Sequence, residues 1–331
     1  MEKAIPLPGK GESKVASLSS RRQVAGWLLL CCVLVFAMVV VGGVTRLTRS
    51  GLSIVEWQPV VGALPPLTQE DWTRKFEAYQ QTPEYLQVNL GMSLAEFKAI
   101  FWWEYIHRLL GRLIGVIFFV PLLYFAWKRK LDPALTPRLV AIFLLGGLQG
   151  AVGWWMVKSG LIDDPRVSHV RLAIHLGIAF LIFAAMLWTA LDLLGTQAPA
   201  RPDSRARRTA YFASGLCVLI FVMVLSGGLV AGTRAGYAYN TFPLMDGHFL
   251  PPEYLMLSPW WSNFLHNMAT VQFNHRIIAW TLFLVVPILW WTMRRLDLPP
   301  RVRLSSNLLL GMLAVQLALG IATLLHRVPV T

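Results

Sequence analysis

The sequence predicts an all-α integral membrane protein, built as two parallel four-helix-bundle repeats in which seven transmembrane helices are visible. Composition, seven long apolar segments and an internal repeat support this prediction. The 331 residues are 56% hydrophobic and 14% charged, whereas soluble domains carry about 25% charged residues. The net charge of +13 would also suit a nucleic-acid-binding protein. Its basic residues, however, cluster between apolar segments, as in loops beside anionic lipid. We therefore expect membrane lipid as a partner and no nucleic acid.

Seven apolar segments are each long enough to cross a bilayer, which takes about 20 residues. They run over 24–44, 104–127, 139–157, 172–194, 209–231, 270–293 and 304–325. Basic clusters lie before the first segment and after the second, fourth and sixth. The positive-inside rule places these clusters, and with them the N-terminus, in the cytoplasm. The two long connections, 45–103 and 232–269, are then on the outer side.

These segments divide the chain into four parts. We expect a cytoplasmic tail over 1–22, a first four-helix half over 23–195, a cytoplasmic linker over 196–208, and an incomplete second half over 209–331. Ser93 and Glu96 have the spacing of a capping box, so the second long helix should begin near Leu94, above the membrane. The three cysteines, Cys31, Cys32 and Cys217, lie in apolar segments, which argues against a disulfide framework or a cysteine-rich metal site.

An internal repeat relates the two halves. VGGVTRLTRSG (41–51) matches SGGLVAGTRAG (226–236), EYIHRLLGRLIG (104–115) matches QFNHRIIAWTLF (272–283), and LQGAVGW (148–154) matches VQLALGI (315–321). Chance similarity between apolar segments is the alternative, but a His-Arg pair and a glutamine recur in register. Parallel repeats of four helices need eight helices. We therefore expect an eighth helix beyond Thr331, with a histidine at about position 342; the alternative is that His326 replaces that ligand.

Three histidines are expected near the outer ends of the helices: His107, His175 and His275. Ionisable residues inside membrane helices are costly and usually functional. Positions 107, 111 and 115 share one helical face and read His-Gly-Gly, which leaves a flat groove below the imidazole. Haem iron takes imidazole as an axial ligand. His107 and His175 could therefore clamp one haem, and His275 could bind another in the second half.

Other interpretations of these residues remain open. A histidine at a helix end can simply form hydrogen bonds, and glycines can simply pack helices together. Zinc is less favoured, because no His-rich or Cys-rich cluster lies within one helical turn. The sequence indicates no role for His169, His248, His266 or His326.

Arginines at the outer rim are expected to bind haem propionates, because guanidinium groups bind carboxylates through two hydrogen bonds. The alternative is that they reach lipid phosphates. The candidates are Arg46, Arg49, Arg108, Arg171, Arg234 and Arg276.

A carboxylate distinguishes the halves. Glu104 lies one turn from His107, whereas the second half has Gln272 at the matching position. A carboxylate can move protons or stabilise a developing cation, but an amide cannot move protons. The first half is therefore predicted to be reactive and the second to transfer electrons. The alternative is a structural ion pair between Glu104 and Arg108, four residues apart.

The motifs GGVTRLTRSGLSIVEWQPVVGALPPL, EYIHRLLGRLIG, DPRVSHVRLAIHLG, AGTRAGYAYNTFPLMDGHFLP and QFNHRIIAW resemble the haem A synthase family over nearly the whole chain. SIVEWQPV and NTFPLMDG resemble its proteobacterial and mitochondrial form. The resemblance implies that haem O is the substrate and that its C8 methyl group is oxidised to the formyl group of haem A. It implies that His107 and His175 flank haem O, that Glu104 is essential, and that His275 holds a haem b cofactor.

The resemblance also carries departures and further expectations. Residues 45–103 lack the cysteine pair of the Gram-positive form, and the family has an eighth helix with a fourth histidine. We expect a bacterial inner membrane location, haem O synthase and an electron acceptor as partners, and leave a homo-oligomer open. The alternative function is a dihaem cytochrome b that only transfers electrons; the difference between Glu104 and Gln272 favours the enzyme. A transporter is disfavoured, because no Gly/Pro-broken helix pair is evident at the midplane.

Overall fold

The computed structural model describes residues 17–59, 61–195 and 203–329, and within these ranges the regular structure is helical, without a named strand. Residues 1–16 of the predicted tail and 196–202 of the predicted linker lie outside the described residues. The described ends of both segments are helical, because α1 begins at Leu18 and α7 at Ser204.

Seven helices are long and apolar enough to cross a membrane, which confirms the seven predicted spans and an integral membrane protein. Each helix extends beyond its apolar run at one or both ends, because neighbouring polar and basic residues continue the helix into the interface. The spans are α1 (Leu18–Leu47), α4 (Leu94–Trp127), α5 (Leu135–Lys158), α6 (His169–Leu194), α7 (Ser204–Thr233), α9 (Met268–Arg294) and α10 (Pro300–Leu325).

The capping box at the start of α4 is confirmed. The Ser93 hydroxyl accepts a hydrogen bond from the Glu96 backbone N–H, and the Glu96 carboxylate accepts one from the Ser93 N–H at 2.8 Å. These bonds satisfy backbone donors that a helix start leaves free. The helix therefore begins at Leu94, ten residues before Glu104, and its extended end carries the long connection 45–103, which is predicted to lie on the outer side and is called the first outer segment.

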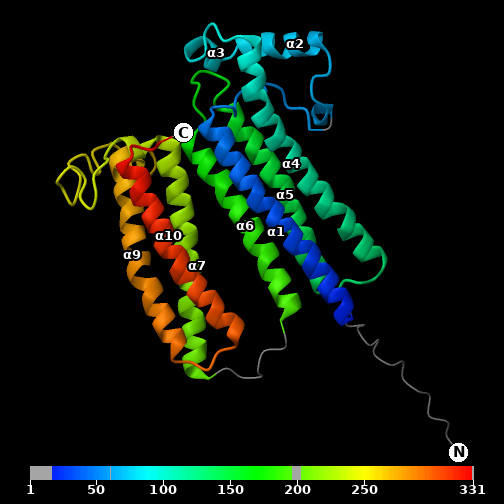
Figure 1. Cartoon of the computed structure of the whole chain (residues 1–331), viewed down its shortest axis with the longest axis vertical. Coiled ribbons are helices and arrows are strands. Elements are labelled where there is room, and N and C mark those ends of the chain that lie inside the picture. Colours follow the sequence, from blue (N-terminus) through cyan, green and yellow to red (C-terminus); the bar gives the residue numbers. More distant parts are fainter. Residues whose placement is uncertain (1–16, 60, 196–202, 330–331) are drawn as a thin grey trace, which may run out of the picture.

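The long helices form two groups that lie side by side (Figure 1). In the first group α1 packs against α4 and α6, and α5 packs against α6. In the second group α7 packs against α9, and α9 against α10. Contacts between α6 and α7 join the groups. The internal repeat itself stays a prediction.

Large apolar side chains fill the end of each group that lies away from the histidines. In the first group Trp27, Phe118 and Met186 belong to one buried cluster, and the Trp27 indole donates to the Ile117 carbonyl at 2.8 Å. In the second group Leu282 and Val286 belong to a corresponding buried apolar cluster. Each group is thus packed with apolar side chains at the end away from the histidines.

The first outer segment forms a small helical cap over the end of α4 (Figure 1). It contains a 3₁₀ turn (Val61–Ala63), α2 (Gln69–Gln80) and α3 (Pro83–Gln87). Trp72 and Tyr79 from α2 pack with Phe97 and Phe101 from α4 in an aromatic cluster. The long connection 232–269, also predicted to lie on the outer side and called the second outer segment, holds 3₁₀ turns (Ala235–Tyr237 and Trp260–Ser262) and α8 (Asn263–His266).

Candidate functional site

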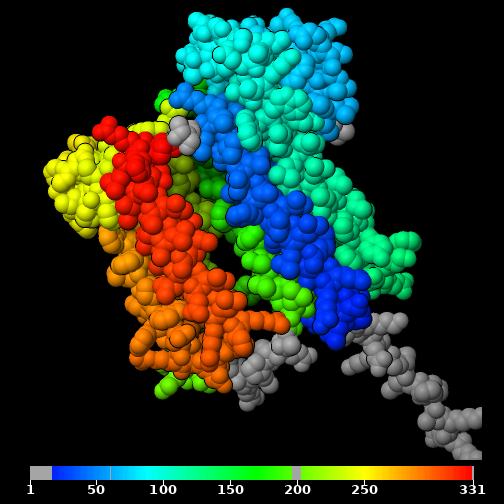
Figure 2. Space-filling model, viewed as in Figure 1, coloured from blue at the N-terminus to red at the C-terminus, as the bar shows by residue number. Residues whose placement is uncertain are grey.

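A large cavity of about 3080 Å³ opens between and within the two helix groups and is lined by all seven long helices. Figure 2 shows the surface hollowed between α10 and α1. His107, His175 and His275 all line this cavity. Sites for single small ligands usually measure about 300–1,000 Å³. The cavity therefore has room for more than one ligand of macrocycle size.

In the first group two imidazoles rest against glycines of neighbouring helices. A Cβ built on Gly42 of α1 would lie 3.0 Å from His107 Cε1, and one on Gly153 of α5 would lie 2.9 Å from His175 Cε1. Among the described residues, Nδ1 of each histidine is buried without a hydrogen-bond partner. Both histidines line the cavity, and an imidazole there is suited to bind a metal-bearing cofactor.

The walls beside these histidines are flat. Gly111 and Gly115 of α4 line the cavity below His107, as the helical periodicity predicts. A Cβ at Gly111 would meet only the end of Met38 at 3.5 Å, and one at Gly115 would meet nothing within 4 Å. Three glycines on α5 have the same open space and also line the cavity: Gly146, Gly147 and Gly150. This smooth face suits a broad planar molecule.

In the second group His275 already has one partner. Its Nδ1 lies 2.8 Å from the Ser226 hydroxyl, which is also 2.9 Å from the Met223 carbonyl. If the hydroxyl donates to that carbonyl, it accepts from Nδ1–H, which leaves the Nε2 lone pair for a metal. Such a partner on the second ring nitrogen is the usual arrangement of a metal-bound histidine. A Cβ on Gly227 would lie 3.5 Å from His275 Cε1, an ordinary contact.

Glu104 is a buried carboxylate held by four hydrogen bonds. It is 2% exposed and lines the same cavity as His107. Its Oε2 accepts from the Ser53 hydroxyl and the Ile54 N–H, each at 2.8 Å. Its Oε1 accepts from Arg108 Nη2 at 2.6 Å and Nε at 3.0 Å. The structural ion pair considered above is therefore present, and the four donors suit a carboxylate anion at a fixed position in the cavity wall.

Gln272 occupies the comparable place in the second group. It is 3% exposed, and its Nε2 donates to the Tyr239 carbonyl at 2.9 Å. Its Oε1 is buried without a partner among the described residues. Arg276, one turn along α9, donates to backbone carbonyls of the second outer segment, including that of Thr241 at 2.9 Å. Both groups thus use a buried polar side chain and an arginine to hold an outer segment, but only the first supplies a carboxylate.

The structure brings five of the six predicted arginines to the cavity wall: Arg46, Arg49, Arg108, Arg234 and Arg276. Arg46 donates to the Ala231 carbonyl and so links α1 to α7. Arg171 does not line the cavity: it donates to the Trp155 carbonyl at 2.7 Å and lies over the Trp155 ring. Arg112, which was not among the predicted site residues, lines the cavity and donates to the Pro59 carbonyl at 2.8 Å.

Arg49 and Arg234 share an unusual backbone conformation. Arg49 lies just after α1 with φ +52°, and Arg234 ends α7 with φ +58°. Residues other than glycine rarely adopt this left-handed conformation, and those that do are often found at functional sites. Within the described residues, neither guanidinium donates a hydrogen bond to protein, so both are available to an anionic group in the cavity.

The remaining histidines have distinct places. His169 is the first residue of α6; its Nε2 lies 2.9 Å from Nδ1 of His266 in α8, and both line the cavity. His248 lies 3.1 Å from the Asp246 carbonyl, and His326 caps the end of α10. Sequence reasoning missed Glu84, a buried carboxylate on the cavity wall. No periodicity marked it, because it lies in a short loop helix.

Comparison with known proteins gives consistent matches over most of the chain. A family model described as "Cytochrome oxidase assembly protein" matches residues 25–331. A Nitrosospira multiformis protein named "Heme A synthase" is 61% identical over 98% of this chain and 90% of its own length. Proteins of the same name from Nitrosomonas eutropha and Parvibaculum lavamentivorans are 56% and 49% identical, over 93% and 94% of this chain and 87% and 88% of their own lengths. No solved structure matches the chain.

Proposed function

The chain belongs to the cytochrome oxidase assembly protein family, and we propose that it is a haem A synthase, which oxidises the C8 methyl group of haem O to a formyl group. The observation that most supports this activity is the buried Glu104 carboxylate on the wall of the cavity that also contains His107 and His175. The second candidate, a dihaem cytochrome b, would need the histidines but has no use for a carboxylate in only one of the two groups.

Haem O is proposed to bind in the first helix group between His107 and His175. Both imidazoles have a buried Nδ1 without a partner among the described residues. Both also rest on glycines, and a Cβ added at either glycine would crowd the imidazole. The open glycine faces of α4 and α5 would lie along the macrocycle. Arg49, at the outer end of the cavity, is available to bind a propionate through two hydrogen bonds.

Glu104 is proposed to stabilise positive charge that develops as the methyl carbon is oxidised. Its anion is held in place by Ser53, Ile54 and Arg108, so little reorganisation is needed when charge appears nearby. The same bonds tie the first outer segment to α4 and cover that side of the cavity. The haem iron, when bound, supplies the redox chemistry, and the protein side chains position the substrate and exclude water.

In the second group His275 is proposed to hold a haem b cofactor, which would supply one-electron transfer. The fit rests on the Ser226 hydroxyl at Nδ1, which favours a free Nε2, and on the position of His275 on the cavity wall. Arg234 and Arg276 line this part of the cavity and would lie near the propionates. Arg276 already donates to loop carbonyls, so Arg234 is the more available of the two.

The proposed orientation places the histidine ends of the helices on the outer side of a bacterial inner membrane, since the basic clusters lie at the opposite ends. Haem O is hydrophobic, so transfer from a neighbouring haem O synthase within the membrane is a reasonable route. An electron acceptor is also required. A homo-oligomer is compatible with the exposed apolar helix faces.

The proposal is tested by expressing the chain in cells that produce haem O but lack haem A, and measuring haem A in solvent extracts. We expect haem A with the unaltered chain, and a reduction of about 100-fold or more with Glu104→Gln, although haem remains bound. The matched control is Glu77→Gln, on the exposed side of α2. Haem A formation by Glu104→Gln at the level of the unaltered chain would contradict the role given to the carboxylate, and its absence with the unaltered chain would favour the cytochrome.

A further inference from the structure

Glu84 is a second buried carboxylate on the wall of the cavity, and none of the roles proposed above uses it. It lies in α3 of the outer cap, is 4% exposed, and lines the cavity together with Glu104 and Arg49. Burial of a charged carboxylate is costly unless donors surround it. The hydrogen bonds of Glu84 are therefore informative about its protonation.

The two carboxylates differ in what surrounds them. Glu104 accepts four hydrogen bonds, two of them from Arg108. Glu84 accepts one, from the Tyr79 hydroxyl, with a long distance of 3.4 Å. Arg49 is the cation whose charge acts on it, and it forms no ion pair with Glu84 in the described residues. Glu104 is thus surrounded by hydrogen-bond donors, whereas Glu84 has few groups that favour its charged form.

The pKa of Glu84 reflects this environment. Burial raises it to about 7, and the negative charge of Glu104 adds to the rise. The Tyr79 hydrogen bond and the charge of Arg49 act in the opposite direction. Both protonation states are therefore populated near neutral pH. Two carboxylates whose environments separate their roles in this way are typical of a site that moves protons.

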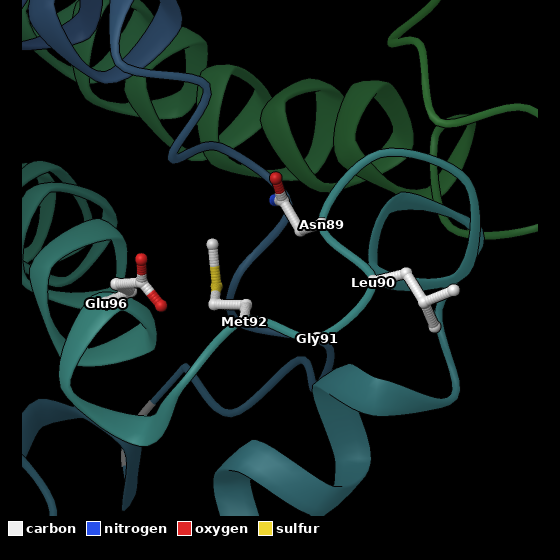
Figure 3. Close-up of a pocket in the computed structure, with 5 residues that line it drawn as sticks. All are labelled: Asn89, Leu90, Gly91, Met92 and Glu96. Atoms are coloured by element: carbon white, nitrogen blue, oxygen red, sulfur yellow. The ribbon is translucent and has the colours of Figure 1, made fainter.

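Polar contacts hold Glu84 close to an open hollow in the surface, and they orient its carboxyl group without relaying its proton, because Tyr79 donates to Glu84 and accepts from Asn89. The Tyr79 hydroxyl accepts a hydrogen bond from Asn89 Nδ2 at 2.7 Å, which directs its own O–H toward Glu84. Asn89 also lines an open hollow in the outer surface together with Met92 and Glu96 (Figure 3). Glu84 thus faces the cavity on one side. On the other side Tyr79 lies between Glu84 and Asn89, which belongs to the wall of this hollow.

We propose that Glu84 is the residue that takes protons from the substrate cavity and releases them to the outer aqueous phase. This inference rests on the proposed function. When water is the oxygen donor, conversion of a methyl C–H to C–OH releases two protons and two electrons. The electrons pass one at a time to a one-electron acceptor. A second such step gives the hydrate, which loses water to form the formyl group. In each transfer a Glu84 carboxylate oxygen forms an O–H bond as an O–H bond of a protonated cavity water breaks, which leaves neutral water. The Glu84 O–H bond then breaks as a water on the outer side takes the proton, which restores the carboxylate.

Tyr79 and Arg49 are positioning residues in this scheme, because they set the charge of Glu84 without receiving the proton. Loss of the Tyr79 hydroxyl removes a donor that favours the Glu84 anion, so the carboxyl should hold its proton to higher pH. The groups that face Glu84 are Tyr79 from α2, Glu104 from α4 and Arg49 from the end of α1. Glu104 and Arg49 have opposite charges. Replacing Glu104 by a neutral residue should therefore lower the pKa of Glu84, whereas replacing Arg49 by a neutral residue should raise it.

The first test is the pH dependence of haem A formation in solubilised membranes supplied with haem O. A group that must accept a proton has to begin as the carboxylate, so the rate should fall as the pH drops through about 7. Glu84→Gln should lower the rate at pH 8 roughly tenfold and abolish this dependence. Glu84→Asp should restore part of both, and Glu77→Gln should match the unaltered chain. A Glu84→Gln variant with unaltered rate and pH profile would overturn the inference.

The second test needs no turnover, so it separates this inference from the proposed function. Infrared difference spectra of the purified protein should show a protonated-carboxyl C=O band that disappears as the pH rises through about 7. The band should be absent in Glu84→Gln and should disappear at higher pH in Tyr79→Phe. A band that persists in Glu84→Gln, or its absence from the unaltered protein, would refute the assignment. If the unaltered chain makes no haem A while this titration is observed, only the proposed function fails.

Discussion

Substitution of Gly153 by alanine should displace His175 and disable the first haem site. The added Cβ would lie 2.9 Å from His175 Cε1, 3.4 Å from Nδ1 and 3.6 Å from Nε2. Ordinary contacts begin at 3.4 Å, so the imidazole would have to move by about 0.5 Å. Distances in metal sites are held within about 0.2 Å. The required movement therefore exceeds what axial coordination tolerates.

The measurement is haem bound per protein, from pyridine haemochrome spectra, together with haem A yield. We expect Gly153→Ala to lower haem A formation by about tenfold or more, because small misplacements at a reacting centre have large effects on rate. The haem of the second group should be unchanged. The matched control is Gly227→Ala, whose Cβ would meet His275 Cε1 at 3.5 Å and which should retain its haem. A folded Gly153→Ala protein with full haem content and full activity would refute the packing argument.

Three further substitutions test other parts of the site. His275→Ala should abolish haem b binding in the second group, since it removes an axial ligand; an unchanged haem b spectrum and stoichiometry would show that another residue is the ligand. Ser226→Ala should weaken haem b binding by about 10–100-fold, because Nδ1 of His275 loses its partner, and a titration with haem that gives unaltered affinity would count against this role. Arg108→Gln should destabilise the protein by about 3 kcal/mol, because it leaves the buried Glu104 without its ion-pair partner; thermal unfolding in detergent measures this loss. The double substitution with Glu104→Gln should recover part of the lost stability, and additive losses would contradict the pairing.

The sequence was sufficient to predict the seven spans and the start of α4. Long apolar runs and a capping box are local features, so they need no knowledge of the tertiary fold. It also predicted that His107, His175 and His275 share a depth, and the structure places all three on one cavity. The expected eighth helix lies beyond the sequence and stays a prediction.

Features that depend on contacts between distant segments could not be predicted. The glycines Gly42 and Gly153 matter because histidines of other helices rest on them. Arg171 was expected at a propionate, but its guanidinium group donates to the Trp155 carbonyl and lies over the Trp155 ring, away from the cavity wall. Glu84 is 20 residues from Glu104 in the chain, and only the folding of the outer cap onto α4 brings its charge close to that carboxylate.

The outer cap also changes the interpretation of Glu104. From spacing alone, a proton-transfer role and an ion pair with Arg108 were alternatives. In the structure the ion pair exists and the carboxylate also accepts from Ser53 and Ile54. A carboxylate with four donors is better suited to stabilising charge than to accepting protons, which is why proton transfer is assigned to Glu84.

Conversion of haem O to haem A by this chain can be tested by identifying the porphyrins bound to the purified protein. The protein is isolated from cells that make haem O, the haems are extracted with acidified solvent, and their masses are determined. We expect haem O or haem A beside haem b, with the formyl product missing from Glu104→Gln. Haem b alone in the unaltered protein would contradict a haem A synthase activity and favour the electron-transfer cytochrome.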